Sequence, residues 1–182
     1  MRNIVSSSRW VLPLAVLLVA ACGGESSQPS PTPTSPGSAP PSPAAPGPVC
    51  DLRDPPSPAA TGEPAQPALR DELLALMDAD QAERTGGSAE GDDASRAARL
   101  AEIIDEHGWP GFTLVGVDGA TAAWVIAQHA DHDVEFQRRA LELMCAAVRA
   151  GDADPIELAY LEDRGAVNSG GPQFYGTQLR GC

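Results

Sequence analysis

Apolar residues recur at helical spacing along most of the chain after Pro67. The first predicted helix opens at Pro67 or Ala68 and carries a single apolar face: Leu69, Leu73, Leu76 and Met77. Asp92 or Asp93 is expected to cap a second helix that Gly108 ends, with its own apolar stripe: Ala97, Leu100, Ile103 and Ile104. These two stripes predict helices that pack on a common core.

The second half of the chain continues the pattern. Residues 112–117 are expected to be short and extended, and Asp118–Gly119 leads into a third helix. A fourth helix is predicted from Asp131 or Asp133 to about Ala150, and a fifth from Ile156 to Arg164. Residues 168–178, here called the strap, are rich in glycine and amides and predict a loop or short hairpin. The expected fold is all-α, with about five helices and this polar strap packed on the bundle.

The amino-terminal residues follow the pattern of an export signal. Arg2 and Arg9 precede an apolar run, residues 10–21, that is too short to span a bilayer. The run ends in Ala20-Ala21-Cys22, which resembles the bacterial lipobox; that resemblance implies cleavage before Cys22 and its diacylation, including palmitate. The alternative is an ordinary secretory signal followed by a chance cysteine. We therefore predict a bacterial lipoprotein, anchored in the cell membrane or outer membrane and facing away from the cytoplasm.

Residues 22–67 are expected to form a tether between this anchor and a helical domain at residues 68–182. Proline, serine and alanine dominate the tether, and proline supplies no amide donor for helix or sheet. Cys50 interrupts it, and an exported location permits disulfides. Cys145 continues an apolar stripe, so we expect a buried thiol there and a Cys50–Cys182 disulfide; Cys145–Cys182 is the alternative.

Charge narrows the range of partners. The chain carries a formal net charge of -13, and all 12 of its basic residues are arginine. An acidic surface repels phosphate backbones, so no nucleic acid partner is expected. Without lysine, the chain cannot form a side-chain Schiff base.

The densest polar cluster follows the apolar residues of the third predicted helix. Gln128 and His129 continue the faces of Trp124 and Val125, four residues earlier, and are therefore candidates for a pocket. His129 could act as an acid or base if Asp163 or Asp133 orients it. The predicted ligand-binding set is Gln128, His129, Arg164, Gln173, Tyr175 and Gln178.

The same polar residues have a structural interpretation. Together with Asp80 and Arg84, they could pair with one another and fasten the strap to the helices. Metal binding by His129 and His132 with the neighbouring aspartates is the weaker hypothesis, because the segment crosses a predicted helix end. We predict no metal and no cofactor.

Several of these residues also form an ordered set of short motifs. They are Asp80-Gln81, Gly108-Trp109-Pro110, Gln128-His129-Ala130-Asp131, Asp163-Arg164 and Tyr175-Gly176-Thr177-Gln178. The set resembles a bacterial domain-of-unknown-function family over roughly residues 69–178. The resemblance implies no established activity. Gly165 departs from it, since a hydrophobic residue usually follows the Asp-Arg pair.

Two functions from different classes are therefore expected. One is a membrane-anchored module that binds a ligand or an envelope protein. The other is an envelope hydrolase with an acid–base site centred on His129. A structural His129 predicts a large loss of stability when the side chain is removed, whereas a site residue predicts little loss.

Overall fold

The computed structural model describes residues 47–57, 62–88 and 91–178 of the 182-residue chain. It contains five helices: α1 (Pro67–Arg84), α2 (Asp93–His107), α3 (Phe112–His129), α4 (Val134–Arg149) and α5 (Pro155–Asn168). The described residues contain no strand, so the all-α prediction is confirmed. No helix within the described ranges has the length and apolar character needed to cross a bilayer.

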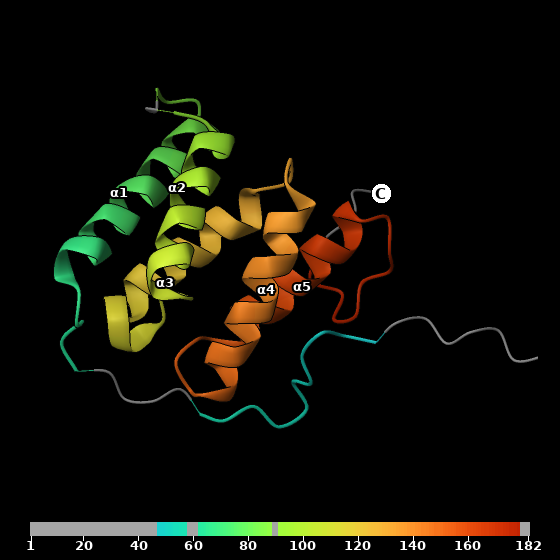
Figure 1. Cartoon of the computed structure of the whole chain (residues 1–182). Coiled ribbons are helices and arrows are strands. Elements are labelled where there is room, and N and C mark those ends of the chain that lie inside the picture. The colour runs from blue at the N-terminus through green and yellow to red at the C-terminus, as the bar shows by residue number, and fades with distance from the viewer. Residues whose placement is uncertain (1–46, 58–61, 89–90, 179–182) are drawn as a thin grey trace, which may run out of the picture. The chain divides into compact units, whose positions relative to one another are not determined.

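Helix α3 is the central element and packs against each of the other four helices. Figure 1 shows it running diagonally between the α1–α2 pair and the α4–α5 pair. Its buried side chains are mostly small, including Ala120, Ala122, Ala123 and Ala127. Small side chains let neighbouring helices approach closely, which explains how one helix can contact four others.

The start of α3 differs from the sequence prediction. Residues 112–117 are helical rather than extended, and the helix bends at Gly116, which has a φ of 75°. Glycine adopts this left-handed conformation without steric cost, so the first turn changes direction and the helix continues. Asp152 holds the turn in place: its backbone oxygen accepts from Phe112 N at 2.9 Å, and its carboxylate accepts from Thr113 N at 2.7 Å.

The other helix ends follow capping chemistry. The Asp92 side chain accepts a hydrogen bond from Ser95 N and the Ser95 hydroxyl accepts one from Asp92 N, which together form a capping box. Asp133 and Asp154 cap α4 and α5 in the same way, each with its carboxylate. Helix α5 ends at Asn168 rather than Arg164, so it takes in the first residue of the strap. The rest of the strap forms turns and bends, with no hairpin.

The predicted cysteine pairing is wrong. Cys50 forms a disulfide with Cys145, with their Cα atoms 5.8 Å apart, and both residues are buried. The helical stripe that suggested a buried thiol at Cys145 does place it in the core, but there it meets residues 47–57. Cys182 and the predicted lipidation site Cys22 lie outside the described residues.

Candidate functional site

The centre of the candidate site is a pair formed by Asp80 of α1 and His129, the last residue of α3. Asp80 is only 1% exposed, and both of its carboxylate oxygens lie 2.9 Å from Nδ1 of His129. The same Nδ1 atom lies 3.0 Å from Nε of Arg84, so Asp80 and Arg84 together hold this side of the ring, and Nε2 is the nitrogen on the other side. The imidazole is 23% exposed, so it is reachable from solvent.

Arg84 completes this cluster one turn after Asp80. Its Nε and Nη2 atoms lie 3.2 Å from the two Asp80 oxygens, and Nη2 also reaches Asp93 of α2 at 3.0 Å. Burial alone would raise the pKa of Asp80, but the hydrogen bonds from Arg84 and His129 outweigh it and lower the pKa. The four residues Asp80, Arg84, Asp93 and His129 are here called the His129 cluster. Within it the Asp80 carboxylate stays ionised where helices α1, α2 and α3 meet. Asp93 was not foreseen from the sequence.

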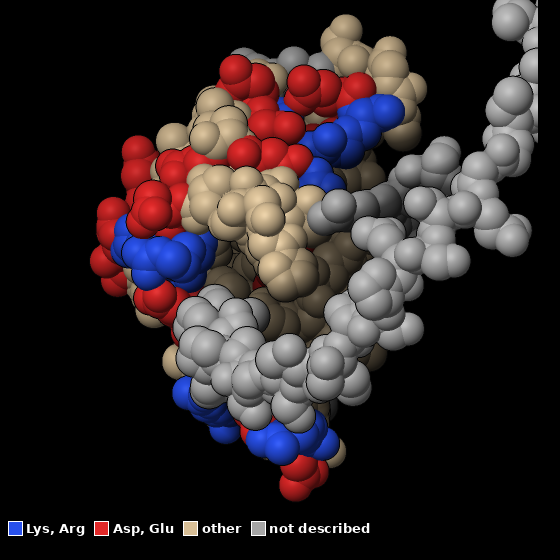
Figure 2. Space-filling view, turned by 90° about the vertical axis from the view of Figure 1, so that its right-hand side faces the viewer, with Lys and Arg blue, Asp and Glu red and all other residues tan. Residues whose placement is uncertain are grey.

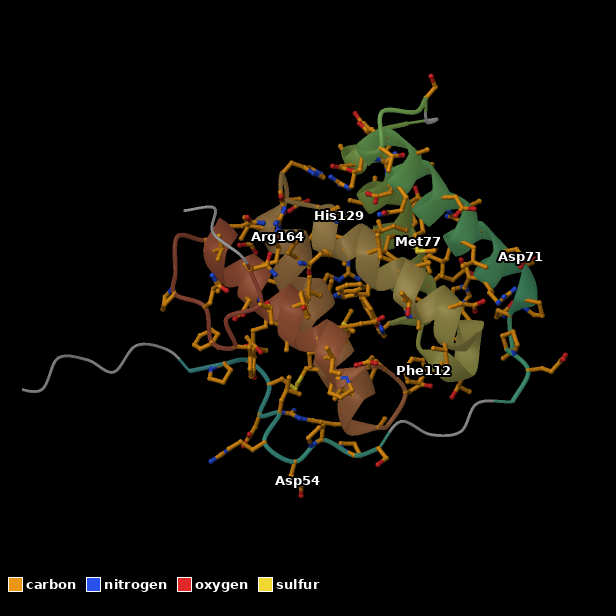
Figure 3. All side chains as sticks on the ribbon, turned by 180° about the vertical axis from the view of Figure 1, so that it is seen from behind. Asp54, Asp71, Met77, Phe112, His129 and Arg164 are labelled. Carbon is orange, nitrogen blue, oxygen red and sulfur yellow. A yellow bond between two sulfur atoms is a disulfide. The ribbon has the colours of Figure 1, made fainter. Side chains whose placement is uncertain are left out.

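Two further residues of α3, within two turns before His129, carry buried polar atoms without partners in the described part of the chain. Trp124 Nε1 and Gln128 Oε1 are both buried and have no hydrogen-bond partner among the described residues. The Trp124 ring meets Tyr160 of α5 edge to face, with centroids 6.2 Å apart. Figure 3 shows His129 at the end of α3, between α1 with Met77 and α5 with Arg164.

Arg164 belongs to a separate cluster. Its guanidinium forms an ion pair with Asp131, to which its Nε donates at 2.8 Å. Asn168 Nδ2 donates to the same carboxylate at 2.8 Å and to Gln137 Oε1 at 2.9 Å. Gln137 is buried, and its amide also reaches Ala127 O at 3.2 Å. The sequence analysis did not include Gln137 and Asn168 in the site. Gln137 follows the helical stripe of α4, and Asn168 lies at the start of the predicted strap.

Asp163 fastens the strap rather than orienting His129. Its carboxylate accepts hydrogen bonds from three backbone amides of the strap, at 2.6 to 3.0 Å, and from the Thr177 hydroxyl at 2.9 Å. Burial would raise the pKa of Asp163, but these donors lower it. Asp133 is also occupied elsewhere, since it caps α4. The sequence predicted Asp163 or Asp133 as the carboxylate that orients His129. In the structure the carboxylate in contact with His129 is that of Asp80.

The remaining predicted ligand-binding residues hold the strap together. Gln173 and Gln178 bond to each other through side chain and backbone, at 2.9 and 2.8 Å. Gln178 also donates to Tyr160 O at 3.2 Å, and Tyr175 donates its hydroxyl to Cys50 O at 3.1 Å. The predicted set thus separates into a part near His129 and a part that is structural.

The structure also bears on metal binding. Within the described ranges, no three histidine, cysteine or acidic side chains are arranged to hold a metal ion. His132 is exposed in the turn before α4, away from the Asp80 contact that holds His129.

These features define the class of protein: a small all-α domain with a buried aspartate–histidine pair and a carboxylate-fastened strap. The chain belongs to the family of unknown function DUF6624, whose model matches residues 67–181. The resemblance inferred from the motifs is thereby confirmed at the level of an uncharacterised family. Neither a curated protein nor a solved structure matches the chain.

Proposed function

We propose that this protein is an exported, lipid-anchored module that binds a ligand at the His129 cluster. The export signal and Cys22 support the anchor, and the acidic, lysine-free composition fits an exposed domain that avoids nucleic acid. The partner is then a small polar molecule or an envelope component that reaches the domain outside the cytoplasm.

A single observation carries the binding site. One nitrogen of His129 is fixed by the buried Asp80, and the other, Nε2, has no hydrogen-bond partner among the described residues. Within two turns before it on α3, Trp124 Nε1 is a buried donor and Gln128 Oε1 a buried acceptor, each without a partner among the described residues. Buried polar atoms are usually satisfied, so this set is suited to a ligand that supplies the missing partners.

An envelope hydrolase is the second candidate function. A carboxylate that holds Nδ1–H of a histidine leaves Nε2 ready to accept a proton, as in a general base. No serine, threonine or cysteine in the described part of the chain bonds to His129. The attacking group in such an enzyme would therefore be a water molecule.

The anchor and the site need separate experiments. Metabolic labelling with an alkyne fatty acid should mark the wild-type chain and leave Cys22→Ser unlabelled; equal labelling of both would exclude the anchor at Cys22. For the site, the full chain is compared with a variant that lacks the imidazole of His129. His132→Ala, in an exposed turn, is the matched control for His129→Ala.

The two variants separate the hypotheses. A site predicts that His129→Ala melts close to His132→Ala and loses a ligand found by screening metabolites and cell-wall fragments. Turnover of that ligand by wild type, and its loss in His129→Gln, would indicate the hydrolase. A melting temperature many degrees lower for His129→Ala than for His132→Ala, with no ligand found for wild type, would show that the cluster is only structural.

A further inference from the structure

A second site is lined by none of the four residues of the His129 cluster. A groove of about 410 Å3 runs between α4, α5, the strap and residues Gly47 and Val49. This volume lies in the range of small-molecule sites. Figure 2 views the molecule from the strap side, where charged side chains surround a hollow whose visible walls are mostly uncharged residues. Much of the groove lining is apolar: Val49, Val134, Leu141, Ala166, Pro172 and Phe174.

One polar group in the groove lacks a partner. Glu162 of α5 is 2% exposed, and its Oε1 atom accepts a hydrogen bond from Val49 N. Its Oε2 atom is buried without a hydrogen-bond partner among the described residues. Burial raises the pKa of this carboxyl above its usual value, while the hydrogen bond from Val49 N and the nearby backbone amide of Cys50 oppose the rise. An unpaired buried oxygen is costly, and a ligand that donates a hydrogen bond would remove that cost.

The charged residues that line the groove favour a positively charged ligand. Glu135 and Arg138 are the other ionisable residues of the lining. Arg138 is already engaged, since it donates to Glu135 at 3.1 Å and to Glu142 at 2.5 Å. No lysine exists anywhere in the chain to neutralise Glu162 from within. A bound cation would meet the Glu162 carboxylate in an apolar setting, where charge-assisted hydrogen bonds are strongest.

We propose that this groove binds a small organic cation, namely a protonated primary or secondary amine with an apolar body. The ammonium donates an N–H to Oε2 of Glu162, and the body packs on Leu141, Val134 and Phe174. A quaternary ammonium has no N–H to donate and binds less well. The groove shares no residue with the His129 cluster. Its test is therefore independent of the proposal that a ligand binds at the His129 cluster.

Gly165 provides a way to close the groove without disturbing the fold. It lies in α5 and lines the groove, and a Cβ added to it would meet no atom within 4 Å. Gly165→Leu therefore places a side chain in the empty space. It also replaces glycine inside a helix, which favours the helix by roughly 1 kcal/mol.

The test is calorimetric titration of the full chain at pH 7 with n-octylammonium, octyltrimethylammonium, 1-octanol and octanoate. We expect one saturable site for octylammonium, with binding at least tenfold weaker for the other three. Gly165→Leu should abolish binding at an unchanged or higher melting temperature. Glu162→Gln should weaken octylammonium at least tenfold, because its amide keeps the acceptor for Val49 N but presents N–H groups to the groove.

Glu135→Gln is the control for general attraction to an acidic surface, and it should change the affinity less than threefold. Equal affinity for octylammonium and 1-octanol would overturn the proposal, as would full binding by Gly165→Leu. If Glu162→Gln proves unstable, NMR shifts of the Leu141 methyls and the Phe174 ring in wild type decide the matter. Octylammonium must then perturb both, and a lack of perturbation counts against the site.

Discussion

Cys50 is covalently bonded to Cys145, 95 residues later, and this bond attaches residues 47–57 to helix α4. The attachment is reinforced on either side. Val49 N donates to Glu162 of α5, and the Tyr175 hydroxyl of the strap donates to Cys50 O at 3.1 Å. The folded unit therefore includes a segment that composition alone would assign to the tether.

Removing this disulfide should lower the free energy of unfolding by about 4–5 kcal/mol, the chain-entropy value for a loop of this length. The suitable variant is the double substitution Cys50→Ala and Cys145→Ala, measured by urea denaturation. Cys182→Ala is the control and should unfold at the wild-type urea concentration. Peptide mapping without reduction should recover residues 50 and 145 in one linked fragment; a fragment linking 50 to 182 would contradict the structure.

Asp163→Ala should release the strap, because it removes the acceptor of three backbone amides and one hydroxyl. We expect a loss of about 2–4 kcal/mol in the free energy of unfolding. Thr177→Val is the matched control: it removes the hydroxyl bond to Asp163 and the one accepted from Gln178 Nε2, keeps the three backbone bonds to Asp163, and should cost about 1–2 kcal/mol. Hydrogen exchange of the Phe174, Tyr175 and Thr177 amides should accelerate strongly in Asp163→Ala. Protected amides in that variant would show that something else holds the strap.

Asp80→Asn should make the protein less stable at neutral pH and less sensitive to acid. The pKa of Asp80 is lower in the folded state than its ordinary value of 3.8. Its stabilising contribution is therefore present above pH 3.8 and lost as the pH falls through the folded-state pKa. Urea denaturation at pH 7 and pH 3 should show a smaller difference for Asp80→Asn than for wild type. Equal differences would mean that Asp80 is not a paired carboxylate.

Glu157 should have the opposite pH dependence. Burial raises its pKa from 4.5 to about 7, although Thr121 donates a hydrogen bond to it at 2.7 Å. Stability from this group is full below pH 4.5 and is lost as the pH rises through 7. Between pH 4.5 and pH 8, the free energy of unfolding of Glu157→Gln should therefore rise relative to that of wild type by on the order of 3 kcal/mol. The substitution leaves Asp154, the cap of the same helix, in place. If Glu157→Gln and wild type showed the same dependence of stability on pH, the raised pKa of Glu157 would be contradicted.

Helix periodicity predicted most of the fold because local signals and tertiary packing agree here. Asp92, Asp133 and Gly108 end or cap helices where they were expected to. The start of α3 could not be predicted, because its geometry depends on Gly116 and on Asp152, which lies 39 residues after Thr113. Helix α5 extends past Arg164 because Asn168 bonds to Asp131 and Gln137 in the tertiary structure.

The sequence identified several residues of the candidate site, but it did not identify which of them contact one another. His129 was identified from its position on a helix face, whereas its partner Asp80 lies 49 residues earlier. Spacing along the chain cannot choose between Asp80, Asp133 and Asp163, because all three are aspartates near polar segments. Glu162 and Gln137 escaped notice for a related reason: each occupies an apolar stripe, and burial of a polar side chain becomes visible only in three dimensions.

The Cys50–Cys145 bond also sets a geometric limit on where this domain can act. Cys50 follows Cys22 by 28 residues, and a chain of that length spans at most about 100 Å in any conformation. If Cys22 holds the lipid, the folded unit is confined to a shell of that thickness above the bilayer. Breaking the bond would leave only the hydrogen bonds of Val49 N and Cys50 O to hold this segment. Where these also open, the point of attachment moves toward Pro67 and the shell widens by more than half. If the domain is exported, an oxidising environment would therefore shorten the greatest distance that it can reach from its anchor.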